Sequence, residues 1–175
     1  ILFHQDPSLQ HWVHAIDLFD TRTMNQVACA GEDTRSGQFS IFVLDLRVNS
    51  TQRVVHKMPV TLGHPLGTML WPLRTHGSHS VYANLSNGPH NRMPPAILHY
   101  DIRKPEGMVE QFSPGSHVED FRVHHNDLYV VTESFNPTTP EVTGPNNQRT
   151  RPSRISLYRY RDGKSSGEFL TALED

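Results

Sequence analysis

Residues 41–47 read IFVLDLR, and this stretch is informative because two similar copies follow it along the chain. Residues 97–103 read ILHYDIR, and residues 155–161 read ISLYRYR. Most columns are similar in the three copies: Ile first, Leu or Tyr fourth, Asp fifth (Arg in the third copy), an apolar residue sixth and Arg seventh. A second marker runs in parallel at a spacing of 53 residues: His11, His64 and His117. The chain therefore contains three similar units.

Within each unit, short apolar runs separated by Gly, Pro, Asn and Ser clusters predict β-strands. The 13 Pro and 11 Gly leave little room for long helices. Four strands are expected in every unit: 12–19, 25–30, 39–47 and 53–59; 68–73, 80–85, 96–103 and 108–112; 118–123, 128–132, 155–160 and 168–173. A repeat of this length with several short strands is typical of propeller blades. We expect an all-β chain of three four-stranded antiparallel blades.

These residues resemble the WD-repeat family, whose blades carry Gly-His before the inner strand and Trp-Asp at the end of the third strand. Gly63-His64 matches the first element, while Leu44-Asp45 and Tyr100-Asp101 match the second with Trp replaced. The resemblance covers nearly the whole chain, although every copy is degenerate. It implies a WD-repeat-like β-propeller.

The stretch 27–33, which reads VACAGED, also looks like the family's second strand and its turn Asp. In the resembled family the blade His bonds this Asp, which implies that Asp33 serves His11. The third unit departs from the pattern, because Arg159 replaces the repeated Asp. A different propeller family with irregular blades is the alternative.

Propellers close with about four to eight blades, and each repeat relies on its neighbours to bury its core. Three blades therefore predict a segment of a larger propeller, completed by a further segment or by a partner chain. The expected division is a preceding blade end or tail at 1–10, blade 1 at 11–62, blade 2 at 63–116, and blade 3 at 117–175 with a long loop at 133–154. A compact fold of three units is the alternative.

The formal net charge of −2 and the pI of about 6.7 do not favour nucleic acid or an anionic membrane surface as a partner. No apolar run approaches the roughly 18 residues needed to span a membrane. The single Cys29 lies in an apolar run and is expected to be a buried, inert thiol. The lack of a disulfide framework favours the cytoplasm or nucleus, although two sequons, at Asn49 and Asn84, lean the other way.

We expect a non-enzymatic protein–protein interaction scaffold without a cofactor, because a repeat scaffold is more often a binding surface than a catalyst. The connections between second and third strands are long, and long loops in compact domains are often functional. Candidate partner-binding positions on these loops are Glu32, Asp33, Asn87, His90, Arg92, Arg149 and Arg151. A solvated loop without a ligand is the alternative.

A basic cluster with interleaved Tyr residues spans 149–164, and such a cluster can stack on bases or on a peptide. The alternative is a strand surface whose Arg residues pair with carboxylates of the neighbouring blade. Because Arg recurs in the seventh column of all three copies, a structural role is the simpler interpretation.

The repeated Asp-x-Arg has a second interpretation. A similar motif in WD-repeat substrate receptors of cullin–RING ubiquitin ligases binds the ligase adaptor, and this resemblance implies adaptor binding through Asp101 and Arg103, or through Asp45 and Arg47. A propeller hydrolase or lyase is a third candidate function, for which the sequence offers no paired carboxylates with facing geometry.

Twelve His residues raise the question of a metal site. His76 and His79 fall in a Gly/Ser turn, and His124 and His125 point to opposite faces if that run is a strand. Zinc needs three or four ligands, and neither pair has a third ligand at suitable spacing. We expect no metal site.

Overall fold

The computed structural model describes residues 11–19, 25–33, 36–48, 54–60, 68–87, 94–104, 108–135, 142–143, 149–150, 153–161 and 166–174. Every regular element in these ranges is a β-strand, and none of these residues belongs to a helix that could cross a membrane. The chain divides into two compact units, Ile1–Gln111 and Phe112–Asp175.

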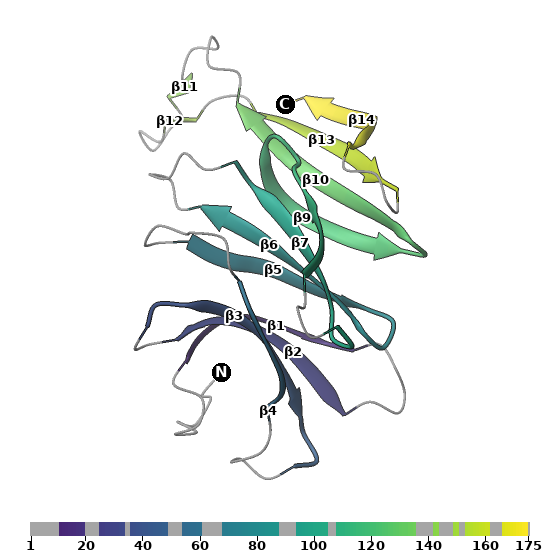
Figure 1. The fold of residues 1–175 in the computed structure, drawn as a ribbon. Coiled ribbons are helices and arrows are strands. Elements are labelled where there is room, and N and C mark those ends of the chain that lie inside the picture. The colour runs from purple at the N-terminus through teal and green to yellow at the C-terminus, as the bar shows by residue number, and fades with distance from the viewer. Residues whose placement is uncertain are drawn as a thin grey trace. The chain divides into compact units, whose positions relative to one another are not determined.

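The strands form three four-stranded antiparallel sheets (Figure 1). The first sheet contains β1 (His11–Leu18), β2 (Gln26–Asp33), β3 (Phe39–Asp45) and β4 (Val54–Pro59). The second contains β5 (Thr68–His76), β6 (Ser80–Asn87), β7 (Ala96–Asp101) and β8 (Met108–Phe112). The third contains β9 (His117–His124), β10 (Asp127–Phe135), β13 (Ser153–Tyr160) and β14 (Glu168–Glu174). Among the described strands, only the pair β10 and β13 joins strands that do not follow each other in the chain. The twelve expected strands are confirmed, with shifts at their ends.

The three repeat copies occupy the same place, since each forms the third strand of its sheet. The His marker is also regular where it is described: His11 begins β1 and His117 begins β9. His64 lies outside the described residues. The repeat in the sequence is therefore a repeat of four-stranded sheets.

The first two sheets share one apolar core within the first unit. Odd positions of the repeat in β3, Ile41 and Val43, are fully buried in this core. Even positions of the repeat in β7, Leu98 and Tyr100, belong to the same core. Alternate side chains of a strand point to opposite faces, so the odd face of the first sheet meets the even face of the second.

Small residues on β2 and β6 suit this face-to-face packing. Ala28 and Ala30 are paired in register with Val43 and Ile41, and Ala83 is paired with Leu98. All three Ala are fully buried in the shared core. The opposite face of the first sheet carries a second cluster: Val27, Cys29, Phe42 and Leu44.

Polar contacts also join the first two sheets. Asp17 in β1 accepts a hydrogen bond from the Thr75 backbone N–H in β5, with N···O 2.7 Å. The Thr75 hydroxyl donates to the Leu18 carbonyl at 2.6 Å. These bonds hold the end of β1 against β5.

Pro72 lies inside β5, although proline has no N–H and cannot donate a hydrogen bond in a regular antiparallel ladder. The pairing of β5 with β6 is irregular between Leu70 and Leu73, and Pro72 falls in this irregular stretch. The strand resumes and continues to His76, three residues beyond the expected end.

In the second unit, the two faces of the third sheet differ. One face is buried through residues of three neighbouring strands: Phe121, Leu128, Val130, Thr132, Ser156 and Tyr160. The other face carries Ile155, which is 39% exposed, opposite Leu173, which is 72% exposed. The third sheet thus presents an apolar pair to solvent.

The long connection of the third unit spans fewer residues than the expected 133–154 and contains two short strands. β10 continues to Phe135 and β13 begins at Ser153. Between them β11 (Val142–Thr143) and β12 (Arg149–Thr150) form a two-stranded antiparallel ladder. The connection between β10 and β13 therefore contains a short hairpin ladder.

Candidate functional site

The Asp-x-Arg turns at the ends of β3 and β7 are built identically. Arg47 donates from its backbone N, Nε and Nη2 to Asp45 at 2.9, 3.0 and 2.7 Å. Arg103 makes the same three bonds to Asp101, at 3.0, 2.9 and 2.7 Å. Both carboxylates are nearly buried, whereas both Arg side chains are more than half exposed. The pairs are bidentate, the strongest arrangement of Arg with a carboxylate.

The backbone of the two turns repeats as well. Leu46 N donates to the Asn25 carbonyl at 2.8 Å, and Ile102 N donates to the His79 carbonyl at 2.9 Å. The Asp carbonyl then accepts from the third residue after it, Val48 or Lys104. Asp favours such turns because its side chain bonds the backbone two residues on. The repeated Asp therefore ends the third strand and closes a turn.

The Arg partner changes the acidity of each Asp. Hydrogen bonds from Arg47 lower the pKa of Asp45 from 3.8 to about 2. Hydrogen bonds from Arg103 hold the pKa of Asp101 well below its ordinary value. Both carboxylates are thus charged at neutral pH.

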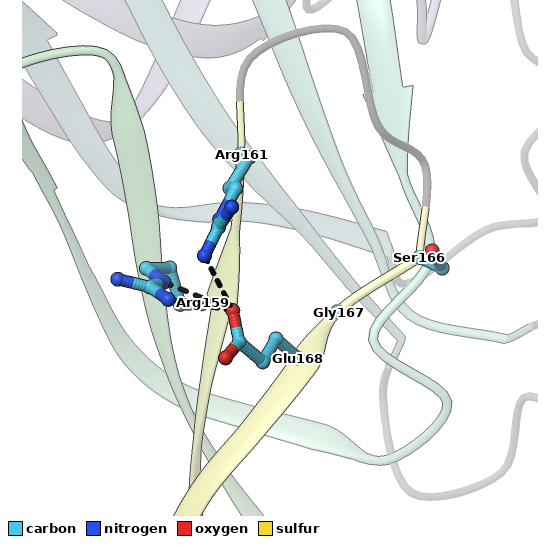
Figure 2. Close-up of a pocket in the computed structure, with 5 residues that line it drawn as sticks. All are labelled: Arg159, Arg161, Ser166, Gly167 and Glu168. Carbon is cyan, nitrogen blue, oxygen red and sulfur yellow. Dashed lines mark hydrogen bonds and ion pairs between the residues drawn. The ribbon is translucent and has the colours of Figure 1, made fainter.

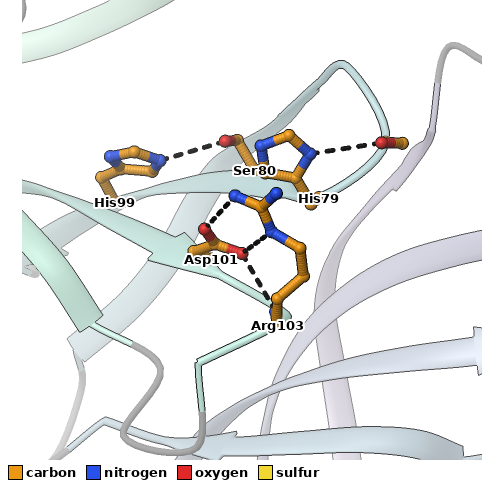
Figure 3. A network of polar contacts seen from close by, with 6 residues as sticks. His79, Ser80, His99, Asp101 and Arg103 are labelled. Atoms are coloured by element: carbon orange, nitrogen blue, oxygen red, sulfur yellow. Dashed lines mark hydrogen bonds and ion pairs between the residues drawn. The ribbon is translucent and has the colours of Figure 1, made fainter.

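Polar side chains surround the second of these turns (Figure 3). His99 Nε2 lies 3.2 Å from the Ser80 hydroxyl, and His79 Nδ1 lies 3.2 Å from the Ser78 hydroxyl. The His99 ring stacks on Tyr82, with ring centroids 4.2 Å apart. These contacts support β7 and its turn.

The third copy has a different arrangement, because Arg159 occupies the place of the Asp. Arg159 Nη2 contacts Glu168 Oε2 at 2.6 Å, and Arg161 Nη2 contacts the same oxygen at 3.3 Å (Figure 2). Glu168 lies on β14, directly opposite Arg159 in register. A single carboxylate from the next strand thus faces two guanidinium groups.

These side chains line an open cleft of about 280 Å³ together with Ser166 and Gly167. A Cβ on Gly167 would lie 2.6 to 2.9 Å from atoms of the buried Tyr160 ring. Glycine is therefore needed at 167 for the chain to pass this close to the aromatic ring.

Several expected partner-binding positions are located in the structure. Glu32 lies in β2 and is partly buried. The backbone of Asp33 lies opposite His11 in register, and the side-chain contact that the family resemblance implies stays a prediction. Asn87 ends β6 and Arg149 begins β12, both without described side chains.

His90, Arg92 and Arg151 lie outside the described residues. Of the expected contact residues, Asp101 and Arg103 are brought together, and they bind each other. Arg159 and Arg161 contact Glu168, a carboxylate of their own sheet, and the expected pairing with a neighbouring blade stays a prediction.

Sequence reasoning missed Ser166, Gly167 and Glu168. A signal was present, since Arg in the Asp column leaves two Arg residues in need of an acid. The hairpin of β13 and β14 supplies that acid across the strands, and its register is not visible in the repeat pattern.

His124 and His125 do not lie together in one strand, which was the condition for their pointing to opposite faces. His124 ends β9, while His125 has φ 55° in the turn that follows. Their rings meet edge to face, with centroids 4.2 Å apart. Within the described ranges, no group of three or more His, Cys, Asp or Glu is placed to hold a metal ion.

Cys29 is confirmed as a buried free thiol. Burial raises its pKa to about 12, which keeps it protonated and unreactive at neutral pH.

Comparison with family models, with curated proteins and with solved structures gave no match.

Proposed function

We propose that this chain is a non-enzymatic interaction scaffold, a WD-repeat-like propeller segment whose third sheet packs against a β-sheet of a protein partner. The partner is a polypeptide that supplies this further sheet. The chain needs no cofactor for this role, and its site of action is the cytoplasm or nucleus.

The observation that carries this proposal is the changing burial of the first Ile of the repeat. Ile41 and Ile97 are fully buried, whereas Ile155 is 39% exposed. In the first sheet, the odd face that holds Ile41 meets the next sheet. By the same logic, the odd face that holds Ile155 is the face expected to meet a following sheet.

The apolar character of this face supports the same role. Leu173 lies beside Ile155, and Val131 and Leu157 are paired in the two adjacent strands of the sheet. Leu157 and Val131 are only partly buried. Exposed apolar groups that lie together favour association with another protein.

The test is native mass spectrometry of the chain purified from cells that express it, with Leu173→Asp as the disruptive variant. The wild-type chain is expected to occur in a complex, and Leu173→Asp is expected to release it as a monomer. Leu46→Asp is the matched control, because Leu46 is 51% exposed and lies in a turn of the first sheet. A wild-type chain found as a folded 19.9 kDa monomer contradicts the proposal.

The ligase-adaptor alternative has less support, because Arg103 already makes a bidentate pair with Asp101. Charge reversal by Arg103→Glu separates the two roles. Loss of adaptor binding with a native circular dichroism spectrum favours the adaptor, whereas loss of the fold favours a structural pair.

The hydrolase or lyase alternative also has little support, since the cleft in Figure 2 holds one carboxylate between two guanidinium groups, whereas most glycosidases use two carboxylates.

A further inference from the structure

We infer that the cleft of Arg159, Arg161, Ser166, Gly167 and Glu168 binds one oxyanion, a carboxylate or phosphate group carried by an acidic segment of the protein partner. This inference rests on the proposed function for the identity of the partner as a protein. The cleft lies between the end of β13 and the start of β14 (Figure 2).

The first argument concerns the hydrogen-bond donors of Arg161. The equivalent Arg103 directs its backbone N, Nε and Nη2 to Asp101. Among the described residues, Arg161 has one recorded contact, from Nη2 to Glu168 at 3.3 Å. A guanidinium carries five N–H donors in a fork that matches a carboxylate or phosphate, so Arg161 retains donors for a ligand.

The second argument concerns charge. Arg159 Nε, Arg159 Nη2 and Arg161 Nη2 all contact the same oxygen, Glu168 Oε2. Among the described residues of the cleft, two positive groups therefore share one negative group, and one further negative charge would neutralise this cluster. Like charges held together favour binding of a counter-ion.

The third argument concerns how the cleft is held in place. Arg159 is fixed by Glu168 and by a hydrogen bond with Tyr129 in β10. Gly167 is fixed against Tyr160, which is 3% exposed and meets Phe112 edge to face. The guanidinium of Arg159 and the chain at 166–168 are thus pre-organised, which reduces the ordering cost of binding.

A protein segment fits this site better than a polyanion. The cluster has a surplus of one positive charge, which suits a single oxyanion and not a nucleic acid backbone. The same face of the sheet carries Ile155, four residues before Arg159, or about 13 Å along the strand at 3.3 Å per residue. A partner with an acidic side chain at that distance from its apolar contacts would satisfy both regions.

Titration with short capped peptides tests the inference. Three peptides of Gly with a central Glu, phosphoserine or Gln are added to the labelled chain, and the backbone amide signals of Ser166 and Gly167 are followed by NMR. The Glu and phosphoserine peptides are expected to shift these signals saturably and more weakly at high salt. The Gln peptide is expected to leave them unchanged. The two charged peptides also distinguish a carboxylate from a phosphate as the preferred group.

Matched variants make the result specific. Arg161→Ala is expected to weaken binding at least tenfold, while Arg103→Ala, in the equivalent column, leaves it unchanged. Glu168→Gln is expected to tighten binding several-fold, because a competing carboxylate is removed. Equal losses for Arg161→Ala and Arg103→Ala, or weaker binding by Glu168→Gln, would overturn the inference.

Two further outcomes separate this inference from the proposed function. If neither charged peptide shifts the signals while Leu173→Asp still releases the complex, the cleft is no anion site and the proposed function stands. If vesicles with anionic lipids bind through Arg161 while the peptides do not, the partner is not a protein segment and the inference fails.

Discussion

The third strands of the second and third sheets, β7 and β13, begin their repeat with the same Ile and end it with the same Arg. In the second sheet, Asp101 lies two residues before Arg103, and the pair closes a turn that ends the strand. In the third sheet, Arg159 replaces the Asp, the strand runs on to Tyr160, and Glu168 supplies the acid from β14. The second copy, whose carboxylate comes from its own strand, forms a closed turn. The third copy, whose carboxylate comes from the neighbouring strand, lines an open cleft.

The side chains of β7 are also more deeply buried than the equivalent side chains of β13. Ile97 and Tyr100 of β7 are inaccessible or nearly so, whereas Ile155 and Tyr158 of β13 are exposed or partly exposed. The same residue types are therefore part of a core in one sheet and part of a surface in the other. The repeated sequence specifies where a strand forms, and the sheets that pack against it decide which face of that strand is buried.

The largest expected contrast comes from truncating the repeated Ile. Ile97→Ala is expected to lower the free energy of unfolding by about 2 to 5 kcal/mol, because it leaves a cavity in a packed interior. Ile155→Ala is expected to cost less than about 1 kcal/mol, because its side chain is partly solvated already. Urea titration of both variants measures the difference. Equal costs would mean that the third sheet is covered in solution, and the comparison would lose its basis.

The next contrast concerns the acid of each copy. Asp101→Asn is expected to cost about 1 to 3 kcal/mol, because a nearly buried group loses its charge-assisted bonds to Arg103. Glu168→Gln is expected to change stability little, since exposed ion pairs contribute little. Thermal unfolding monitored by circular dichroism compares the two. A Glu168 variant as unstable as the Asp101 variant would show that both acids are structural.

Gly167 at the third sheet and Gly77 at the second sheet are needed for different reasons. A side chain at 167 lacks space, whereas a side chain at 77 strains the backbone. Gly167→Ala is expected to cost about 1 to 3 kcal/mol, because its Cβ must displace the Tyr160 ring. Gly77→Ala is expected to cost about 1 kcal/mol, because Gly77 has φ 60° and open space around it. Gly77→Asn should recover most of that loss, since Asn tolerates this conformation. Equal recovery by Gly167→Asn would contradict the steric explanation.

The smallest expected effect is the pH dependence of the closed turn. The folded-state pKa of Asp45 is about 2, below the ordinary 3.8, so its contribution is present above about pH 4 and is lost as the pH falls toward 2. The difference in Tm between the wild type and Asp45→Asn should therefore shrink across this window. A difference that stays constant from pH 6 to pH 2 would show that the charge of Asp45 does not matter.

Much of the fold was predictable from local chemistry. Short Val, Ile, Leu and Tyr runs between Gly, Pro and Asn clusters predicted twelve strands, and the observed β8 coincides with the expected 108–112. The long connection was harder, because β11 and β12 have two residues each and little apolar content. Strands that short leave no periodic pattern.

The candidate site was predictable only in part. The repeat singled out Asp45 and Arg47, which the structure brings into contact, but it did not predict that they bind each other. Glu168 was not predictable, because its contact with Arg159 depends on the register of β13 with β14, and a shift of one residue would turn Glu168 to the other face.

The sequence by itself determined three repeated units and the strand type of each segment, whereas the turns at Asp45 and Asp101 interrupt the expected strands 39–47 and 96–103. The units and their strands follow from local rules: alternation along a strand, backbone conformations favoured by glycine, and short-range hydrogen bonds. Only the tertiary structure decided that Ile41 is covered while Ile155 is exposed, and that two guanidinium groups share Glu168. Burial and cross-strand contacts depend on which surfaces meet in space, and residues distant in the chain decide that.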